Sequence, residues 1–164
     1  MEYKNIFSFD IEWNYKTIST FFVLLALPNL LGMMNISTPW GFKLHFFQLA
    51  VFIAALIYGP LGGMFSGMVG SLYPAVIMHN PYIVGGNMIL GLFVGLFVRY
   101  KINIILAVLL AYIVQLPWLI ITDYFFMHLS GRFIVGLVIA LAISNTIWAI
   151  VSGYFYPRLK RMLS

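Results

Sequence analysis

Long apolar runs follow one another along almost the whole chain, and this pattern limits the folds that it can adopt. They lie at about 17–34, 46–58, 61–78, 82–99, 102–122 and 131–157, and turn residues or charges separate them. About 20 apolar residues in a helix span the hydrocarbon core of a bilayer. Only 8% of the residues are charged, whereas a soluble domain carries about 25%. The sequence therefore predicts an all-α integral membrane protein of six transmembrane helices, with residues 1–164 as a single transmembrane domain.

Only Gly59 and Pro60 separate the second run from the third. Glycine readily ends a helix, and the residue before a proline is biased away from helical geometry. We therefore expect two spans here, although merging the two runs would give five in all.

The positions of the basic residues predict the orientation, because cytoplasmic connectors carry an excess of Lys and Arg. With six spans and the N-terminus inside, only Lys43 and Arg132 face outward. The bases that then face the cytoplasm are Lys4, Lys16, Arg99, Lys101, Arg158, Lys160 and Arg161. This asymmetry favours an N-in/C-in protein of the cell membrane.

Small residues recur at helical spacing and predict how the helices pack. The third run carries one at every fourth position, and a second small stripe of Gly62, Ser66 and Gly70 lies beside the first. Small residues allow membrane helices to approach closely, so we expect this helix to be central, with partners on two sides. The residues that we expect at helix contacts here and in the fourth run are Gly59, Gly63, Gly67, Ser71, Gly91 and Gly95. Pro28 should also free the carbonyl of Leu24 from its helical hydrogen bond.

The sequence offers no set of residues for covalent chemistry. It contains no cysteine and three histidines, which are scattered, so neither a nucleophile–base pair nor a metal site is expected. A glycine-rich phosphate loop ending in Lys-Ser or Lys-Thr is also absent. The bases lie at the ends of segments instead of forming a patch with interleaved aromatics, which argues against nucleic-acid binding. We expect no catalytic residues, cofactor or metal.

Four amide side chains lie inside or at the edge of the apolar runs, where burial is costly. They are Gln48, Asn87, Gln115 and Asn145. They could hydrogen-bond between helices, worth about 0.6 kcal/mol per pair. They could also line a pocket, because Gln115 shares a helix face with Trp118, as Asn145 does with Trp148. An amide beside an indole suits a small heteroaromatic or amphipathic ligand.

Two further features lie on the predicted outer side. Asp123 closes the fifth run and Arg132 opens the sixth, so the two could pair with each other or meet a charged group of a ligand. The connector 35–45 contains Trp40 and has the composition of a lid, although an indole at this position could equally be an interfacial anchor.

The middle of the chain resembles a known family. The stretch 47–71 contains a Tyr-Gly-Pro-x-x-Gly break followed by a glycine ladder, and 87–99 reads Asn-x-x-x-Gly-x-x-x-Gly and ends in Arg99. These features are similar to the substrate-binding S components of energy-coupling factor (ECF) transporters. The resemblance implies a protein that captures a vitamin or related micronutrient at the outer face. It also implies partners, namely a transmembrane coupling protein and two cytoplasmic ATPases that drive release inward. The substrate-binding residues that it selects are Trp40, Asn87, Gln115, Trp118, Asp123 and Asn145.

The first helix departs from the family pattern. Members often carry Ala-x-x-x-Ala there for docking to the coupling protein, whereas this chain has Ser19-x-x-x-Val23 as the nearest substitute. The N-terminal Met-His segment of the cobalt and nickel members is absent, so a metal substrate is not expected. The alternative function is a non-transporting membrane scaffold whose glycine-rich faces bind other membrane proteins.

Overall fold

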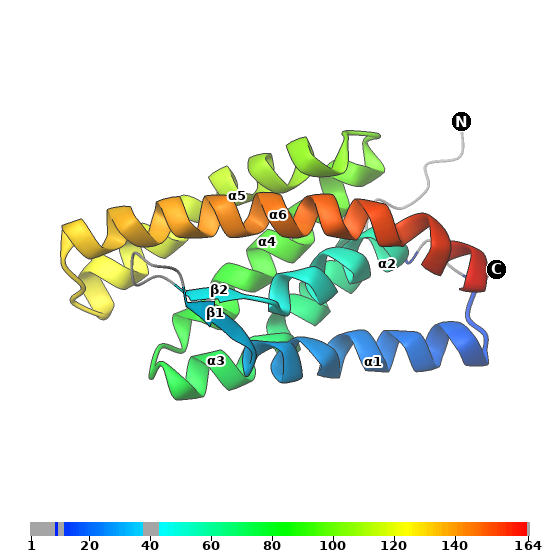
Figure 1. Cartoon of the computed structure of the whole chain (residues 1–164), viewed down its shortest axis with the longest axis horizontal. Helices are drawn as coiled ribbons and strands as arrows, with labels where there is room; N and C mark the ends of the chain where they lie inside the picture. Colours follow the sequence, from blue (N-terminus) through cyan, green and yellow to red (C-terminus); the bar gives the residue numbers. More distant parts are fainter. Residues whose placement is uncertain (1–8, 10–11, 38–42, 164) are drawn as a thin grey trace.

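The computed structural model describes residues 9, 12–37 and 43–163, which form an elongated helical bundle (Figure 1). Its elements are α1 (Tyr15–Gly32), β1 (Asn35–Ser37), β2 (Lys43–His45), α2 (Phe47–Gly70), α3 (Leu72–Ile77), α4 (Tyr82–Arg99), α5 (Ile104–Ile121), the π-helical segment η1 (Thr122–Phe126) and α6 (Gly131–Leu163). Five helical stretches are long and apolar enough to cross a membrane: Tyr15–Gly32, Phe47–Ile77, Tyr82–Arg99, Ile104–Phe126 and Gly131–Leu163. The predicted helical membrane architecture is thus confirmed.

The chain reverses direction inside α2. Gly59 has φ 74° and ψ −159°, a conformation open to glycine and strained for other residues. A Cβ built on Gly63 would lie 2.8 Å from the Cβ of Ala55, whereas eight residues of straight helix rise about 12 Å. The segments before and after Gly59 therefore fold back on each other as a helical hairpin. The label α2 covers both of its arms.

The second arm of this hairpin packs antiparallel to α4 through its glycines. Gly63 meets the backbone of Gly91, and Gly67 meets the backbone of Asn87. Nearer the hairpin turn, a Cβ on Gly95 would lie 2.6 Å from the backbone nitrogen of Pro60. Backbones approach this closely only where side chains are missing, so this contact depends on glycine on both helices.

The same arm packs against α1 on its other side. Gly70 meets the ring of Pro28, and Ser66 Oγ donates a hydrogen bond to the carbonyl of Leu24 over 2.7 Å. That carbonyl is the one that Pro28 frees from the helical pattern. A neighbouring helix thus satisfies a polar group that would be unfavourable in lipid.

The ends of several elements differ from the apolar runs. The third run breaks at Ser71 into α2 and α3, and the fifth continues past residue 122 as η1. The sixth does not end at 157, since α6 reaches Leu163. Hydropathy does not mark these ends because the helical hydrogen bonds continue beyond the apolar residues or change register within them. The short antiparallel pair β1–β2 also adds strands to a fold expected to be all-α.

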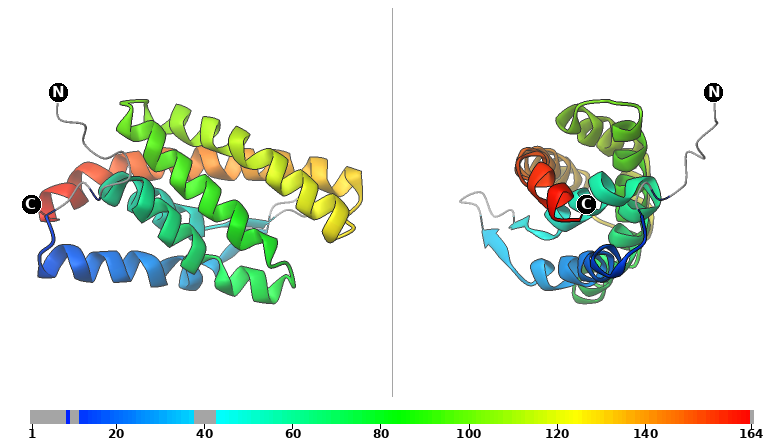
Figure 2. Two further views of the ribbon diagram at one scale, coloured as in Figure 1. Left: turned by 180° about the vertical axis from the view of Figure 1, so that it is seen from behind. Right: turned by 90° about the vertical axis from the view of Figure 1, so that its right-hand side faces the viewer.

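The start of α1 and the end of α6 lie at one end of the bundle, and α3 and η1 lie toward the other (Figures 1 and 2). Tyr156, Leu159 and Leu163 of α6 pack on the same cluster as Phe21 of α1. On the outside, α6 exposes more than half of Ile139, Ile143 and Ile150. This apolar surface suits contact with lipid.

Candidate binding cavity

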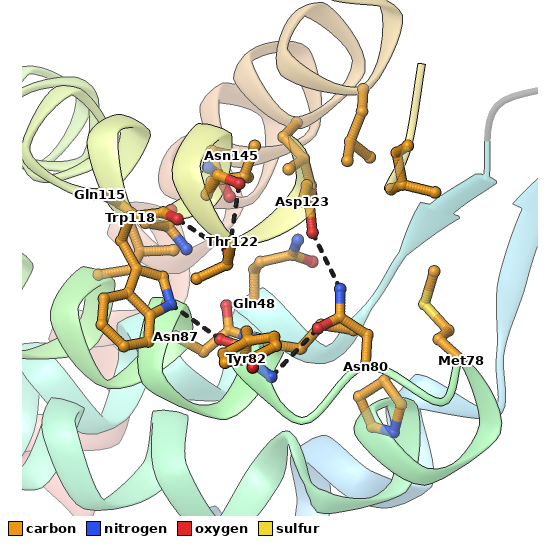
Figure 3. Close-up of a pocket in the computed structure, with 18 of the residues that line it drawn as sticks. Gln48, Met78, Asn80, Tyr82, Asn87, Gln115, Trp118, Thr122, Asp123 and Asn145 are labelled. Atoms are coloured by element: carbon orange, nitrogen blue, oxygen red, sulfur yellow. Dashed lines mark hydrogen bonds between the residues drawn. The ribbon is translucent and has the colours of Figure 1, made fainter. Parts of the chain in front are cut away.

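A cavity of about 140 Å³ lies toward the end of the bundle away from the start of α1 and the end of α6, and Figure 3 shows side chains that line it. That volume is about ten times what one water molecule requires, so a compact small molecule fits. Its walls come from every helix except α1. The lining residues are Phe47, Gln48, Pro74, Met78, Asn80, Tyr82, Ile83, Gly86, Asn87, Leu90, Gln115, Trp118, Leu119, Thr122, Asp123, Leu129, Phe133, Leu137, Leu141 and Asn145.

Residues that the sequence analysis proposed as substrate-binding converge on this cavity from four elements. Asn87 comes from α4, Gln115 and Trp118 from α5, Asp123 from η1 and Asn145 from α6. Trp40 lies outside the described residues. The structure therefore places the five side chains together, while ligand binding by them stays a prediction.

Asp123 reaches the cavity because of the π-helical segment. It is 5% exposed, and its Oδ1 accepts a hydrogen bond of 2.9 Å from Nδ2 of Asn80. Short π-helical turns are rare and are found often at functional sites, since the wider turn re-aims side chains. Arg132 is exposed, and no ion pair joins it to Asp123 among the described residues. Of the two readings left open by the sequence, the structure thus favours a carboxylate that faces the cavity.

Trp118 supplies a wall of the cavity but no free donor. Its Nε1–H donates to the carbonyl of Tyr82 over 3.0 Å. A Cβ on Gly85 would lie 2.6 Å from Cζ2 of the indole, so the ring lies directly on α4 where that helix has no side chain. The indole therefore presents its apolar face to the cavity, and hydrogen bonds to a ligand would have to come from other side chains such as the amides.

Two amide oxygens at the cavity have no hydrogen-bond partner in the described structure. They are Oε1 of Gln48, which is 2% exposed, and Oδ1 of Asn145, which is 1% exposed. Figure 3 shows the side chain of Gln48 extending into the middle of the pocket. Buried polar atoms are nearly always paired, so two unpaired acceptors in one cavity indicate that something else supplies the donors.

Asn80, Tyr82 and Thr122 were not assigned to the site from the sequence, and Gln48 was named as a possible pocket-lining amide but not among the substrate-binding residues selected by the resemblance. Gln48 carried a usable signal, because it is an amide inside an apolar run. Asn80 did not, since an Asn before a Pro reads only as a turn. It lines the cavity because its Oδ1 accepts from the backbone N–H of Tyr82 over 3.1 Å, which fixes its side chain at the start of α4.

A second and wider cavity, of about 720 Å³, lies at the end of the bundle where α1 begins and α6 ends. Its lining includes Glu12, Arg99, Lys101 and Lys160. None of the five described substrate-binding candidates lines it, whereas all five line the smaller cavity, which is therefore the better candidate site. Ser19, proposed for partner docking, is exposed on α1, and its Oγ donates to the carbonyl of Lys16 over 3.0 Å.

Comparison with known proteins gives one informative match. Neither protein-family models nor curated proteins match this sequence. Among solved structures, the chain is similar to one described as "Structure and mechanism of the S component of a bacterial ECF transporter". The TM-score is 0.68 at 22% identity, and the match covers 91% of this chain and 98% of the other. The resemblance seen in the sequence thus holds in three dimensions, and the chain has the fold of an ECF transporter S component.

Proposed function

We propose that the protein is the substrate-capture subunit of an importer in the cell membrane. It binds a small water-soluble vitamin or related micronutrient in the cavity near η1. A transmembrane coupling protein with two cytoplasmic ATPases then drives its release inward. The subunit itself carries out no covalent step.

The observation that carries this proposal is the convergence at the cavity. Asn87, Gln115, Asp123 and Asn145 are far apart in the sequence and come from four elements, yet they line one space in an otherwise apolar bundle. Ionisable and amide groups at membrane depth usually mark a substrate path or site. In a fold shared with a transporter subunit, capture of a small molecule is the function that uses all of them.

The proposal includes six spans with both termini inside and residues 1–164 as one transmembrane domain. The reversal at Gly59 supports this count, because each arm of the hairpin then crosses separately. The start of α1 and the end of α6 lie at the same end of the bundle, as an even number of crossings requires (Figure 2). That end carries Lys16, Arg99, Lys101 and the basic residues of α6, whereas the cavity lies toward the opposite, outer end.

The coupling step rests on α1. Ser19 is exposed and Val23 is 55% exposed, so the face that replaces the Ala-x-x-x-Ala pattern is open to a partner. The glycine ladder is different, because Gly63 and Gly91 face each other inside the bundle. A scaffold that bound other membrane proteins through these glycines would first have to separate α2 from α4, and this disfavours the alternative.

The test is to purify the full chain in mild detergent from cells grown in rich medium, denature it, and identify released compounds by mass spectrometry. We expect one small molecule in near-stoichiometric amount. A Gln115→Leu variant, purified in parallel, should release little of it. If nothing is released, and no vitamin in a panel raises the thermal unfolding temperature, the capture function is wrong, because a bound ligand stabilises the folded state.

A further inference from the structure

The described residues that line the cavity include one charged side chain, Asp123. A carboxylate offers about four acceptor positions, and the one hydrogen bond found for the carboxylate of Asp123 comes from Asn80. A buried charge is unfavourable unless it is paired. No Lys, Arg or His side chain is found among these described lining residues, so a ligand with a positive charge would complement Asp123 on this wall of the cavity.

Three of the hydrogen-bond donors at the cavity are engaged within the protein. Trp118 Nε1–H donates to Tyr82, and Asn80 Nδ2 donates to Asp123. The hydroxyl of Thr122 donates to the carbonyl of Trp118 over 2.8 Å. These three side chains line the pocket but have given their donors to other protein groups.

Three acceptor groups at the cavity, by contrast, have free positions. Oε1 of Gln48 and Oδ1 of Asn145 are buried and unpaired, and Asp123 retains unused acceptor positions. They come from α2, α6 and η1, so three walls of one cavity present acceptors to whatever occupies it. A site with a carboxylate and two unpaired amide oxygens is complementary to a molecule that carries N–H groups.

The remaining surface sets the shape of that molecule. Phe47, Leu90, Leu137 and Leu141 line the cavity with apolar side chains, and Trp118 contributes its indole. Such walls favour a flat, weakly hydrated ring. An aromatic face also attracts a cation but not an anion.

From these observations we infer the chemical class of the cargo, an inference that rests on the proposed capture function. The ligand is a heteroaromatic compound that presents a cationic or N–H-rich nitrogen to Asp123, Gln48 and Asn145. A compound whose only charge is a carboxylate or phosphate is rejected, because that group would meet the buried carboxylate and the free amide oxygens.

The test compares three probes that share one ring and differ in charge: 3-(aminomethyl)pyridine, nicotinamide and nicotinate. Their affinities for the purified full chain are measured by calorimetry, and the compound released on denaturation is tested for a basic nitrogen by electrophoresis at neutral pH. We expect the ammonium probe to bind at least tenfold more tightly than nicotinate, with nicotinamide between them. The natural cargo should migrate as a cation or as a neutral base.

The Asp123→Asn variant sharpens the test, since the amide keeps an acceptor oxygen for Asn80 and removes only the charge. It should lose at least tenfold in affinity for the ammonium probe and change little for nicotinamide. Glu12→Gln, which removes an exposed acid at the other end of the bundle, is the matched control and should bind as the wild type does.

The outcomes separate the two proposals. An anionic cargo without a basic nitrogen, tighter binding of nicotinate than of the ammonium probe, or an unchanged Asp123→Asn variant would overturn the ligand class while leaving capture intact. If no compound is released and none of the probes binds the wild type, the capture function fails and the ligand class fails with it.

Discussion

Asn80 and Asp123 are joined by a hydrogen bond of 2.9 Å that links the connector before α4 to the π-helical segment after α5. The other end of the same amide accepts from the backbone of Tyr82 over 3.1 Å. One side chain thus caps a helix and holds the only acidic group found among the described cavity residues. This link sets the position of the carboxylate on the wall of the cavity.

We expect Asn80→Ala to lower the free energy of unfolding by about 1–3 kcal/mol, because a buried carboxylate loses its partner. Equilibrium unfolding of Asn80→Ala, of Asp123→Ala and of the double variant would measure the coupling energy between the two side chains. The double variant should be less destabilised than the sum of the single variants, since removing both partners leaves no unpaired charge. Strict additivity would show that the hydrogen bond contributes nothing.

We expect Gly63→Ala to destabilise the bundle by about 2–3 kcal/mol, the range typical of overpacking. The new methyl group would meet the backbone of Gly91 on one side and, at 2.8 Å, the Cβ of Ala55 on the other. Neither neighbour is a flexible side chain that could move away. Thermal unfolding in detergent would measure the loss.

The matched control for this substitution is Gly131→Ala. That residue also lies in a helix, and a Cβ there would meet nothing within 4 Å. Its unfolding temperature should stay within a degree or two of the wild type, since surface substitutions of this kind change stability by less than about 0.5 kcal/mol. Equal losses in both variants would show that the contact between α2 and α4 does not explain the effect, because Ala has a higher helix propensity than Gly.

Gln115→Leu and Asn145→Leu should abolish binding of the copurified ligand while the protein stays folded, because each removes a polar group that faces the cavity. Calorimetry and size-exclusion chromatography would report the two properties separately. Asn29→Leu is the contrasting variant. The native Asn29 side chain is also an amide. It donates to the carbonyl of Val69 over 2.8 Å and accepts from the N–H of Tyr73 over 2.9 Å, away from the cavity.

For Asn29→Leu we therefore expect the reverse result, a lower unfolding temperature with ligand affinity unchanged in the folded fraction. If the cavity variants unfold and show no separate loss of binding, their amides serve helix packing and the scaffold function gains support.

The absence of cysteine allows a direct test of the topology. Tyr100→Cys lies in the connector after α4, and Ser130→Cys lies just before α6; both native residues are exposed. With six spans and the N-terminus inside, a membrane-impermeant maleimide should label only Ser130→Cys in intact cells. Tyr100→Cys should react only after permeabilisation. The opposite pattern would rule out six spans with the N-terminus inside, leaving either five spans, with α2 crossing once, or six spans with the N-terminus outside.

Much of the fold could be predicted from the sequence because lipid imposes a simple rule on it. Each long helix must be apolar over about the thickness of the bilayer, so the fourth apolar run and α4 have the same limits, 82 and 99. The break at Gly59-Pro60 could be placed for a different reason, since few residues other than glycine adopt its backbone angles. Hydropathy could not reveal that α6 extends to Leu163 or that the fifth run continues as η1, because these ends depend on hydrogen-bond register.

The candidate site was only partly predictable. The amides stood out because burying them in an apolar run is unfavourable, and the ECF resemblance selected Asp123 as well. Asn80 and Tyr82 gave no such signal, and the hydrogen bond from the indole N–H of Trp118 to the carbonyl of Tyr82 could not be read from the sequence. Which polar atoms remain unpaired depends on contacts between distant segments.

The sequence by itself determined that the helices are suited to lipid and roughly where they lie, because both follow from the length of the apolar runs. The spacing of Gly and Ser determined which small residues the helices pack through. Only the tertiary structure decided that the chain folds back at Gly59, that Ser66 satisfies the carbonyl freed by Pro28, and that Asp123 is held by Asn80 at a cavity. The burial of a single polar side chain can be predicted from the apolar residues around it in the sequence. The pairing of two groups 43 residues apart depends on how whole helices are arranged, and local composition carries no record of that.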